Sequence, residues 1–316
     1  MHSKTNSLAV DVVYKGDEGF LFLAGGAHGV FDLVDGKRAP TSTSLNSFWS
    51  NYKARSAFTN SKGYRFRTVI FPEKSVALKH LIPTGENFES IYQRFYKRDL
   101  KPRGRREIIY PLSAVQREEA FSKTDSHNSA KGYTSIFKEI ASGLFPKKTA
   151  KAVELIEATY EVCNVSGDLG GKFSPAISES LPIFIRPPLP IELASNGIVH
   201  GNSGVLVLVN SKNSLSNKTL LIFGDSFFRA MLPLLATCYR KIVFCRTPFF
   251  HYELVNAVAP DDIFCGIAER YLSRCQLDSS RPHFLSFPYL SGRATKPDPK
   301  FGELWSKTID MEKLLE

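Results

Sequence analysis

The sequence predicts an α/β fold with a mainly parallel sheet, because strand-like and helix-like segments alternate in both halves of the chain. The clearest unit spans residues 220–239, where an apolar run of strand length is followed by a Gly-Asp-Ser turn and an apolar segment typical of a buried helix. No run of about 20 apolar residues occurs, so no transmembrane helix is expected. The 316 residues, 43% of them hydrophobic, are enough to bury a substantial core.

In the first third of the chain, short apolar or aromatic runs predict strands, and aromatic residues at helical spacing predict a helix. Asp17 and the neighbouring glycines favour a tight turn between the first two strands. Pro72 ends a third, buried strand. The predicted strands are 9–14, 20–23, 64–71 and 107–110, and the predicted helices are 42–58 and 87–96.

The remaining two thirds of the chain continue the alternation. A helix is predicted at 133–144, where Ile136, Ile140 and Leu144 share one face. The other expected elements are a helix or turn at 149–158, a Gly-rich loop at 164–171, a Pro-rich extended segment at 181–191, strands at 205–209, 220–223, 242–244 and near 260–265, a helix at 228–239 and an amphipathic piece at 304–315. We therefore expect one α/β domain over residues 1–292 and a charged tail at 293–316.

The net charge of +10 has two interpretations: a polyanionic partner, or a solvated surface with a small positive excess. The densest basic cluster, residues 97–106, carries Pro and Gly and is expected to be a loop. No RNA-binding signature or helix-turn-helix pattern accompanies it, so nucleic acid is not an expected partner.

The cysteine count and the polar start of the chain indicate a reducing compartment. Five cysteines without a CxxC pair predict reduced thiols rather than a disulfide framework or a zinc site. The first residues lack the apolar core of a signal peptide, which predicts a cytoplasmic protein, or a periplasmic one if an export segment has been removed.

Ser226 is the candidate nucleophile, because it follows a predicted strand and precedes a predicted helix. Sites in open α/β sheets form beyond the carboxyl ends of the strands. A hydroxyl there meets the free N–H groups and the positive dipole end of the helix, which could stabilise an oxyanion. The alternative interpretation of Gly-Asp-Ser is a simple helix cap.

A serine needs a base to act as a nucleophile at neutral pH. His127 is the candidate base, since Asp125 two residues earlier could accept a hydrogen bond from one imidazole nitrogen while the other faces the serine. The alternative interpretation of Asp-x-His is a solvated polar loop. The other histidines have no carboxylate two residues before them, and no metal-ligand spacing is present.

Several short motifs follow one another along most of the chain. They are residues 14–23, 69–75, 81–83, Asp125-Ser126-His127 with Gly132, residues 167–170, residues 223–227 and residues 259–272. In this set and order the sequence resembles the SGNH-hydrolase-like polysaccharide O-acetyltransferases, the family that includes the alginate O-acetyltransferases. That family places Asp-x-His before Gly-Asp-Ser, whereas ordinary SGNH esterases place Asp-x-x-His after the nucleophile.

The resemblance implies an SGNH-hydrolase-like three-layer fold, with a mainly parallel sheet and helices on both faces. It also implies that Ser226 is the nucleophile, His127 the general base and then acid, and Asp125 the orienting carboxylate. The mechanism it implies is a double displacement through an acyl-enzyme. Asn128 stands where the family usually has tryptophan, a residue expected near the acceptor, so the acceptor type stays open.

The expected function is O-acetylation of a polysaccharide or glycan, such as a capsule or exopolysaccharide, with an acidic glycan suited to the basic charge. No cofactor is expected to stay bound; acetyl-CoA or another acetyl donor is the co-substrate, and a membrane-bound partner would supply the acyl group to an exported protein. The alternatives are a carbohydrate acetylesterase with the same triad and a non-catalytic glycan-binding protein.

Other polar residues are weaker candidates. The backbone N–H of Ser226 is one expected oxyanion donor, and Asn202 and Asn210 are candidates for the second donor or for substrate binding. Asp225 is grouped with them, although stabilising the turn is its more natural role. Asp168 lies in the Gly-rich loop and is either close to the pocket or a turn former.

Overall fold

A central seven-stranded sheet organises the computed structural model, which describes residues 12–97, 104–198, 203–292 and 294–315. The strand order is β4-β3-β11-β9-β10-β8-β7. Neighbours from β4 to β10 pair in parallel, whereas β8 pairs antiparallel with both β10 and β7. The strands are β3 (Arg65–Phe71), β4 (Ile108–Ile109), β7 (Ile191–Ser195), β8 (Leu206–Ser211), β9 (Thr219–Gly224), β10 (Lys241–Arg246) and β11 (Asp262–Ala268).

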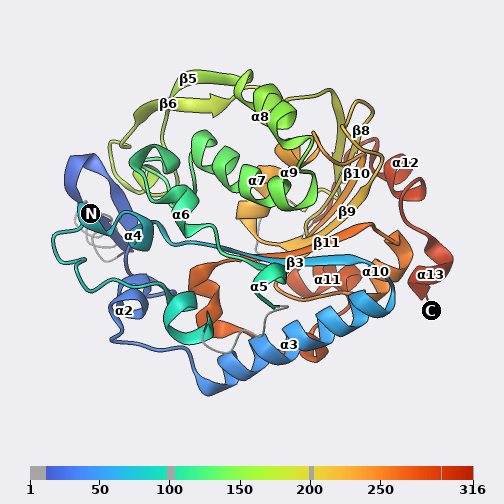
Figure 1. Cartoon of the computed structure of the whole chain (residues 1–316), viewed down its shortest axis with the longest axis horizontal. Helices are drawn as coiled ribbons and strands as arrows, with labels where there is room; N and C mark the ends of the chain where they lie inside the picture. Colours follow the sequence, from blue (N-terminus) through green and yellow to red (C-terminus); the bar gives the residue numbers. More distant parts are fainter. Residues whose placement is uncertain (1–11, 98–103, 199–202, 293, 316) are drawn as a thin grey trace.

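Helices cover both faces of this sheet (Figure 1). One layer contains α7 (Ala130–Leu144), α8 (Thr149–Glu157) and α9 (Ser226–Leu235), and the other contains α3 (Ser42–Ser61), α10 (Tyr252–Val258) and α11 (Phe287–Ser291). The shorter helices are α2 (Val30–Asp35), α4 (Lys74–Ala77), α5 (Gly104–Glu107), α6 (Leu112–Val115), α12 (Phe301–Ser306) and α13 (Met311–Leu315). The predicted three-layer α/β fold with a mainly parallel sheet is confirmed.

The central strands β9, β10 and β11 carry continuous apolar runs between their end residues, because both of their faces are covered. In β9, Leu220 and Ile222 pack into the core beneath α7 and α9, while Leu221 and Phe223 pack into the core on the other face. This alternation follows from the two-residue period of a strand. The end of β9 is therefore held rigidly between two apolar layers.

Two hairpins lie outside the central sheet. The first joins β1 (Val13–Lys15) to β2 (Leu21–Leu23), as the turn chemistry predicts. The second joins β5 (Tyr160–Val165) to β6 (Glu179–Phe184), and it differs from the prediction of a loop followed by one extended segment. Its strands are only partly buried, so they lack the continuous apolar pattern by which a core strand is recognised.

Some element boundaries also differ from the prediction. Helix α9 starts at Ser226 instead of residue 228, because Asp225 caps it. The segment predicted as a helix at 87–96 forms a π-helical turn at Tyr92–Tyr96. Near the C-terminus, Leu304 of α12 and Leu314 of α13 are buried in the core cluster that includes α10.

Two predicted features extend beyond the described part of the chain. Residues 9–11 of the first predicted strand and residues 98–103 of the basic cluster lie outside the described residues. All five cysteines are described, and all are free thiols. Across the described ranges, no helix combines the length and the apolar character that crossing a membrane requires.

Candidate active site

Ser226 is the first residue of α9 and lies beyond the carboxyl end of β9. Two glycines let α9 approach the sheet at this point. A Cβ on Gly266 would lie 1.9 Å from the Phe228 ring, and one on Gly224 would lie 2.9 Å from it. Because neither glycine has a side chain, Phe228 packs directly over the ends of β9 and β11, and Ser226 is held at the edge of the sheet.

Asp225 caps α9 and links it to the neighbouring strand. Its Oδ1 accepts a hydrogen bond of 3.0 Å from the N–H of Phe227, and its Oδ2 accepts one of 2.7 Å from the N–H of Ala268. Burial raises the pKa of Asp225, and the two N–H donors oppose that rise. Both carboxylate oxygens are thus engaged by the backbone, so Asp225 shapes the turn that carries Ser226.

A short loop before α7 carries Asp125 and His127. An antiparallel bridge between Phe121 and Asn128 closes this loop, and Ser129 caps α7 by accepting from the N–H of Gly132. The closed loop turns the side chain of Asp125 toward His127. Its Oδ1 accepts from the backbone N–H of His127 at 2.8 Å and lies 2.7 Å from Nδ1 of the same residue.

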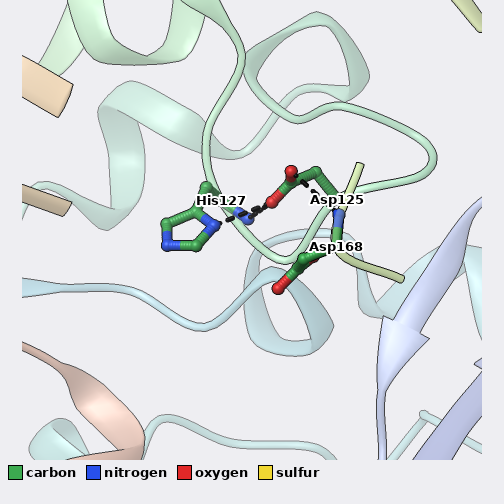
Figure 2. Close-up of side chains that lie close together, drawn as sticks. All are labelled: Asp125, His127 and Asp168. Carbon is green, nitrogen blue, oxygen red and sulfur yellow. Dashed lines mark hydrogen bonds and ion pairs between the residues drawn. The ribbon is translucent and has the colours of Figure 1, made fainter. Parts of the chain in front are cut away.

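The structure brings Ser226, His127 and Asp125 together in one hydrogen-bonded chain. Nε2 of His127 lies 2.8 Å from Oγ of Ser226, across 99 positions of sequence. Figure 2 shows the imidazole of His127 facing the Asp125 carboxylate. The His127 ring also packs against the Phe227 ring, with centroids 4.6 Å apart. Three contacts, with Ser226, Asp125 and Phe227, therefore fix the orientation of the imidazole.

Asp125 is ionised throughout the neutral pH range. Burial alone would raise its pKa, but the hydrogen bonds and the charge of His127 outweigh that effect and lower the pKa of Asp125 well below its usual value. An ionised Asp125 accepts from Nδ1–H, which leaves Nε2 of His127 as an acceptor for the Ser226 hydroxyl.

Asp168, which lies beside Asp125 in Figure 2, supports the same loop. Its carboxylate accepts from the N–H of Ser126 at 2.7 Å and from the Ser126 hydroxyl at 2.6 Å, and its own N–H donates to Asp125 at 3.2 Å. A Cβ on Gly167 would lie 2.4 Å from Cβ of Asp125, so this close approach requires glycine.

Asp125, His127 and Asp168 each offer a ligand atom, and these atoms lie within 4.8 Å of one another, a spacing that a metal ion could use. Both carboxylates and both imidazole nitrogens already make the hydrogen bonds described above. We therefore interpret the group as an acid–base network.

Lys74 and Glu179 both hydrogen-bond to the loop that carries Asp125, and neither is among the site residues predicted from the sequence. Nζ of Lys74 donates to the carbonyls of Leu21, Ser122, Lys123 and Asp125 at distances of 2.5–3.1 Å. Burial lowers the pKa of Lys74 to about 7, although nearby carboxylates oppose that shift. Lys74 falls within the motif at residues 69–75, but nothing in that motif indicated a contact with the Asp125 loop.

Glu179 of β6 accepts hydrogen bonds from the backbone N–H groups of the same loop. Its carboxylate accepts from the N–H groups of Lys123 and Thr124 at 2.9 and 2.7 Å, and from the hydroxyls of both Ser122 and Thr124. Because Glu179 belongs to the unpredicted β5–β6 hairpin, only the folded chain reveals its contact with this loop.

Replacing Lys74 with methionine should destabilise the protein by about 2–4 kcal/mol, because two buried and two partly buried carbonyls lose their donor. Urea unfolding measures this change. Lys138→Met is the matched control, since Lys138 is exposed on α7 and its side chain makes no hydrogen bond or ion pair with a described residue; its effect should stay within about 0.5 kcal/mol. Equal stabilities for the two variants would show that Lys74 does not hold the loop.

The other predicted site residues do not join the hydrogen-bonded series of Asp125, His127 and Ser226. Asn210 of β8 lies opposite Lys241, which begins β10, so it is at the edge of the sheet away from Ser226, and its side chain donates to Glu192. Asn210 therefore supplies no oxyanion donor in this arrangement. Asn202 lies outside the described residues.

Comparisons with known proteins support the fold. Comparison of the sequence with protein-family models and with curated proteins gives no match. Among solved structures, PatB1 from Bacillus cereus is similar with a TM-score of 0.56 and 13% identity, over 84% of this chain and 100% of that chain. PatB1 with a sulfonyl adduct has a TM-score of 0.57 and 12% identity, with the same coverage.

A third similar structure is the O-acetyltransferase domain of Pseudomonas putida AlgJ, with a TM-score of 0.46 and 13% identity over 89% of this chain and 99% of that chain. At these identities the comparisons establish the fold alone. The chain shares a three-layer α/β fold with PatB1, and at the carboxyl edge of its sheet a serine, a histidine and an aspartate are hydrogen-bonded in series.

Proposed function

We propose that this protein is an O-acetyltransferase that moves an acetyl group from a donor to a hydroxyl of a polysaccharide or glycan. The observation that carries the proposal is the series Asp125–His127–Ser226, in which both links measure 2.8 Å or less. This series opens onto a cavity of about 590 Å³. The order of the sequence motifs, which resembles that of polysaccharide O-acetyltransferases, selects this reaction among those a serine nucleophile can perform.

In the first half of the reaction, Oγ of Ser226 attacks the carbonyl carbon of the donor while Nε2 of His127 takes the hydroxyl proton. The charge that develops on the carbonyl oxygen lies near the first turn of α9. The N–H of Ser226 has no hydrogen-bond partner among the described residues and is free to donate to that oxygen. When the bond to the leaving group breaks, His127 returns the proton to it, and acetyl-Ser226 remains.

In the second half, a sugar hydroxyl attacks the acetyl carbonyl and His127 takes its proton. The tetrahedral intermediate then collapses, the bond to Ser226 breaks and Oγ regains the proton from His127. Asp125 stabilises the imidazolium in both halves through the 2.7 Å contact with Nδ1. If water replaces the sugar hydroxyl, the same residues perform ester hydrolysis.

The acyl donor is a co-substrate and not a resident cofactor in this proposal. A cytoplasmic enzyme would use acetyl-CoA, whereas an exported one would take the acetyl group from a membrane-bound partner of polysaccharide biosynthesis. The acceptor is a polysaccharide or glycan, and the net charge of +10 suits an acidic one.

A chromogenic acetyl ester, supplied with and without an oligosaccharide, tests the proposal. We expect mass spectrometry to find an acetyl group on the peptide that contains Ser226, and acetylated oligosaccharide to form when the acceptor is present. Ester cleavage with no acetylated sugar would identify an esterase instead. Absence of both acetyl-Ser226 and turnover would leave a glycan-binding protein.

A further inference from the structure

A second cavity, of about 200 Å³, lies between α3 and the carboxyl ends of β3, β9 and β11. We call it the α3 cavity. Helix α3 covers the face of the sheet opposite to α9 (Figure 1). Gly224 and Asp225 line the α3 cavity, whereas Ser226 lines the catalytic one, and no described residue lines both. The turn before α9 therefore separates two distinct cavities.

Aromatic side chains from four parts of the fold line the α3 cavity. They are Phe48 and Tyr52 of α3, Phe223 of β9, Phe249 after β10, and Tyr271 of the 3₁₀ helix η7 (Glu269–Arg274). Aromatic rings gain energy from edge-to-face or offset contacts with another ring. An apolar cavity of about 150 Å³ is sufficient to bind benzene, so the α3 cavity has room for one aromatic ring with a small substituent.

Thr68 of β3 brings an unpaired hydroxyl to this lining. The residue is only 6% exposed, and its hydroxyl makes no hydrogen bond with a described residue. It differs from the hydroxyls of Tyr133 and Ser211, which are also unpaired but are sealed by the atoms around them. A molecule in the α3 cavity can therefore reach the Thr68 hydroxyl. Because buried polar groups are almost always paired, this hydroxyl indicates a ligand group that donates or accepts a hydrogen bond.

The charged side chains among the described lining residues leave no buried charge free. Arg55 donates to both carboxylate oxygens of Asp278, at 2.7 and 2.6 Å, and both oxygens of Asp225 accept from backbone N–H groups. Arg274 is exposed, and its guanidinium donates to the carbonyl of Ala27. A charged ligand would lose its hydration without gaining a buried partner, so an uncharged ligand is favoured.

We propose that the α3 cavity is a binding site for a small, uncharged phenol. Its ring lies among the aromatic side chains, and its hydroxyl is hydrogen-bonded to Thr68. Thr68 can donate to the phenol oxygen or accept from it, because a threonine hydroxyl does both. Binding needs neither an acyl donor nor Ser226, so the site is independent of acetyl transfer.

NMR of the full-length protein, with isoleucine δ1-methyl groups labelled, tests the location of the site. Ile267 lines the α3 cavity and Ile183 lines the catalytic cavity, so the two residues are matched reporters. Titration with 4-methylphenol should shift the Ile267 methyl resonance and leave that of Ile183 in place, because ring currents act only at short range. A shift at Ile183 alone, or at neither methyl, would overturn the proposal.

Thr68→Val tests the hydrogen bond, since valine has nearly the shape of threonine and lacks the hydroxyl. The affinity for 4-methylphenol, followed at Ile267, should fall at least about fivefold. Toluene has the same ring and methyl group without the hydroxyl, and its affinity should stay within about twofold. An unchanged affinity for 4-methylphenol, or an equal loss for both ligands, would exclude Thr68 as the partner of the phenol.

Thr43→Val is the matched control, because Thr43 is exposed on α3 and its side chain makes no hydrogen bond with a described residue. It should leave both affinities within about twofold of wild type. A comparison in the wild-type protein needs no variant to fold. There, 4-methylphenol should bind at least as tightly as toluene, although removing its hydroxyl from water costs free energy. Weaker binding of 4-methylphenol than of toluene would contradict a paired hydroxyl.

Discussion

Replacing Ser226 with alanine should lower acetyl transfer at least about 10³-fold, because no other described hydroxyl contacts Nε2 of His127. The same variant should also resist phenylmethanesulfonyl fluoride, whose sulfur forms a bond to an activated serine oxygen as fluoride leaves. Mass spectrometry of the treated proteins locates the label.

Ser166→Ala is the matched control for that experiment. Ser166 lines the same cavity, but its hydroxyl donates to the carbonyl of Ile177 and does not contact His127. This variant should keep transfer within about threefold of wild type and should still be labelled on Ser226. Equal activity of Ser226→Ala and wild type would exclude Ser226 as the nucleophile.

Replacing Asp125 with asparagine should lower kcat by about 10³- to 10⁴-fold with little change in KM for the donor. The amide keeps the shape of the carboxylate, but its NH₂ group can donate toward Nδ1 of His127 and so stabilise the wrong tautomer. Nε2 would then carry the proton and could not accept one from Ser226. The lowered pKa of Asp125 reflects the same pairing with His127.

Asp168→Asn separates this role from simple support of the loop. Asp168 accepts from Ser126 and does not touch the imidazole, so its variant should lose only about tenfold in kcat. Steady-state kinetics, with melting temperatures measured in parallel, compares the two variants. Equal losses for Asp125→Asn and Asp168→Asn would mean that both act only by shaping the loop.

Local patterns in the sequence were sufficient to predict most of the architecture. A strand such as β9 is recognisable because a strand covered on both faces must be apolar throughout, and its helix because an apolar segment follows a Gly-Asp-Ser turn. The position of Ser226 at the sheet edge follows from that order of elements. The neighbouring Asp125 and His127 likewise needed only a short loop to meet.

The contacts of the site that join segments far apart in the sequence could not be predicted from local patterns. The hydrogen bonds of Lys74 and Glu179 join segments that are separated by about 50 positions or more from the loop they hold, and no local pattern encodes such a meeting. The position of Asn210 depends on strand direction, because β8 runs antiparallel to β10 and carries this residue to the opposite edge. The position of β6 along the cavity beside Ser226 is also a long-range feature that no local pattern encodes.

Sequence by itself determined the type and order of the elements and the residues with suitable chemistry, because hydrophobic periodicity and turn preferences act over a few neighbouring positions. Only the tertiary structure decided which of those residues meet, and which distant segments line the cavity beside Ser226. Distances between remote side chains depend on how the two apolar layers pack against the sheet, and that packing is a property of the whole chain.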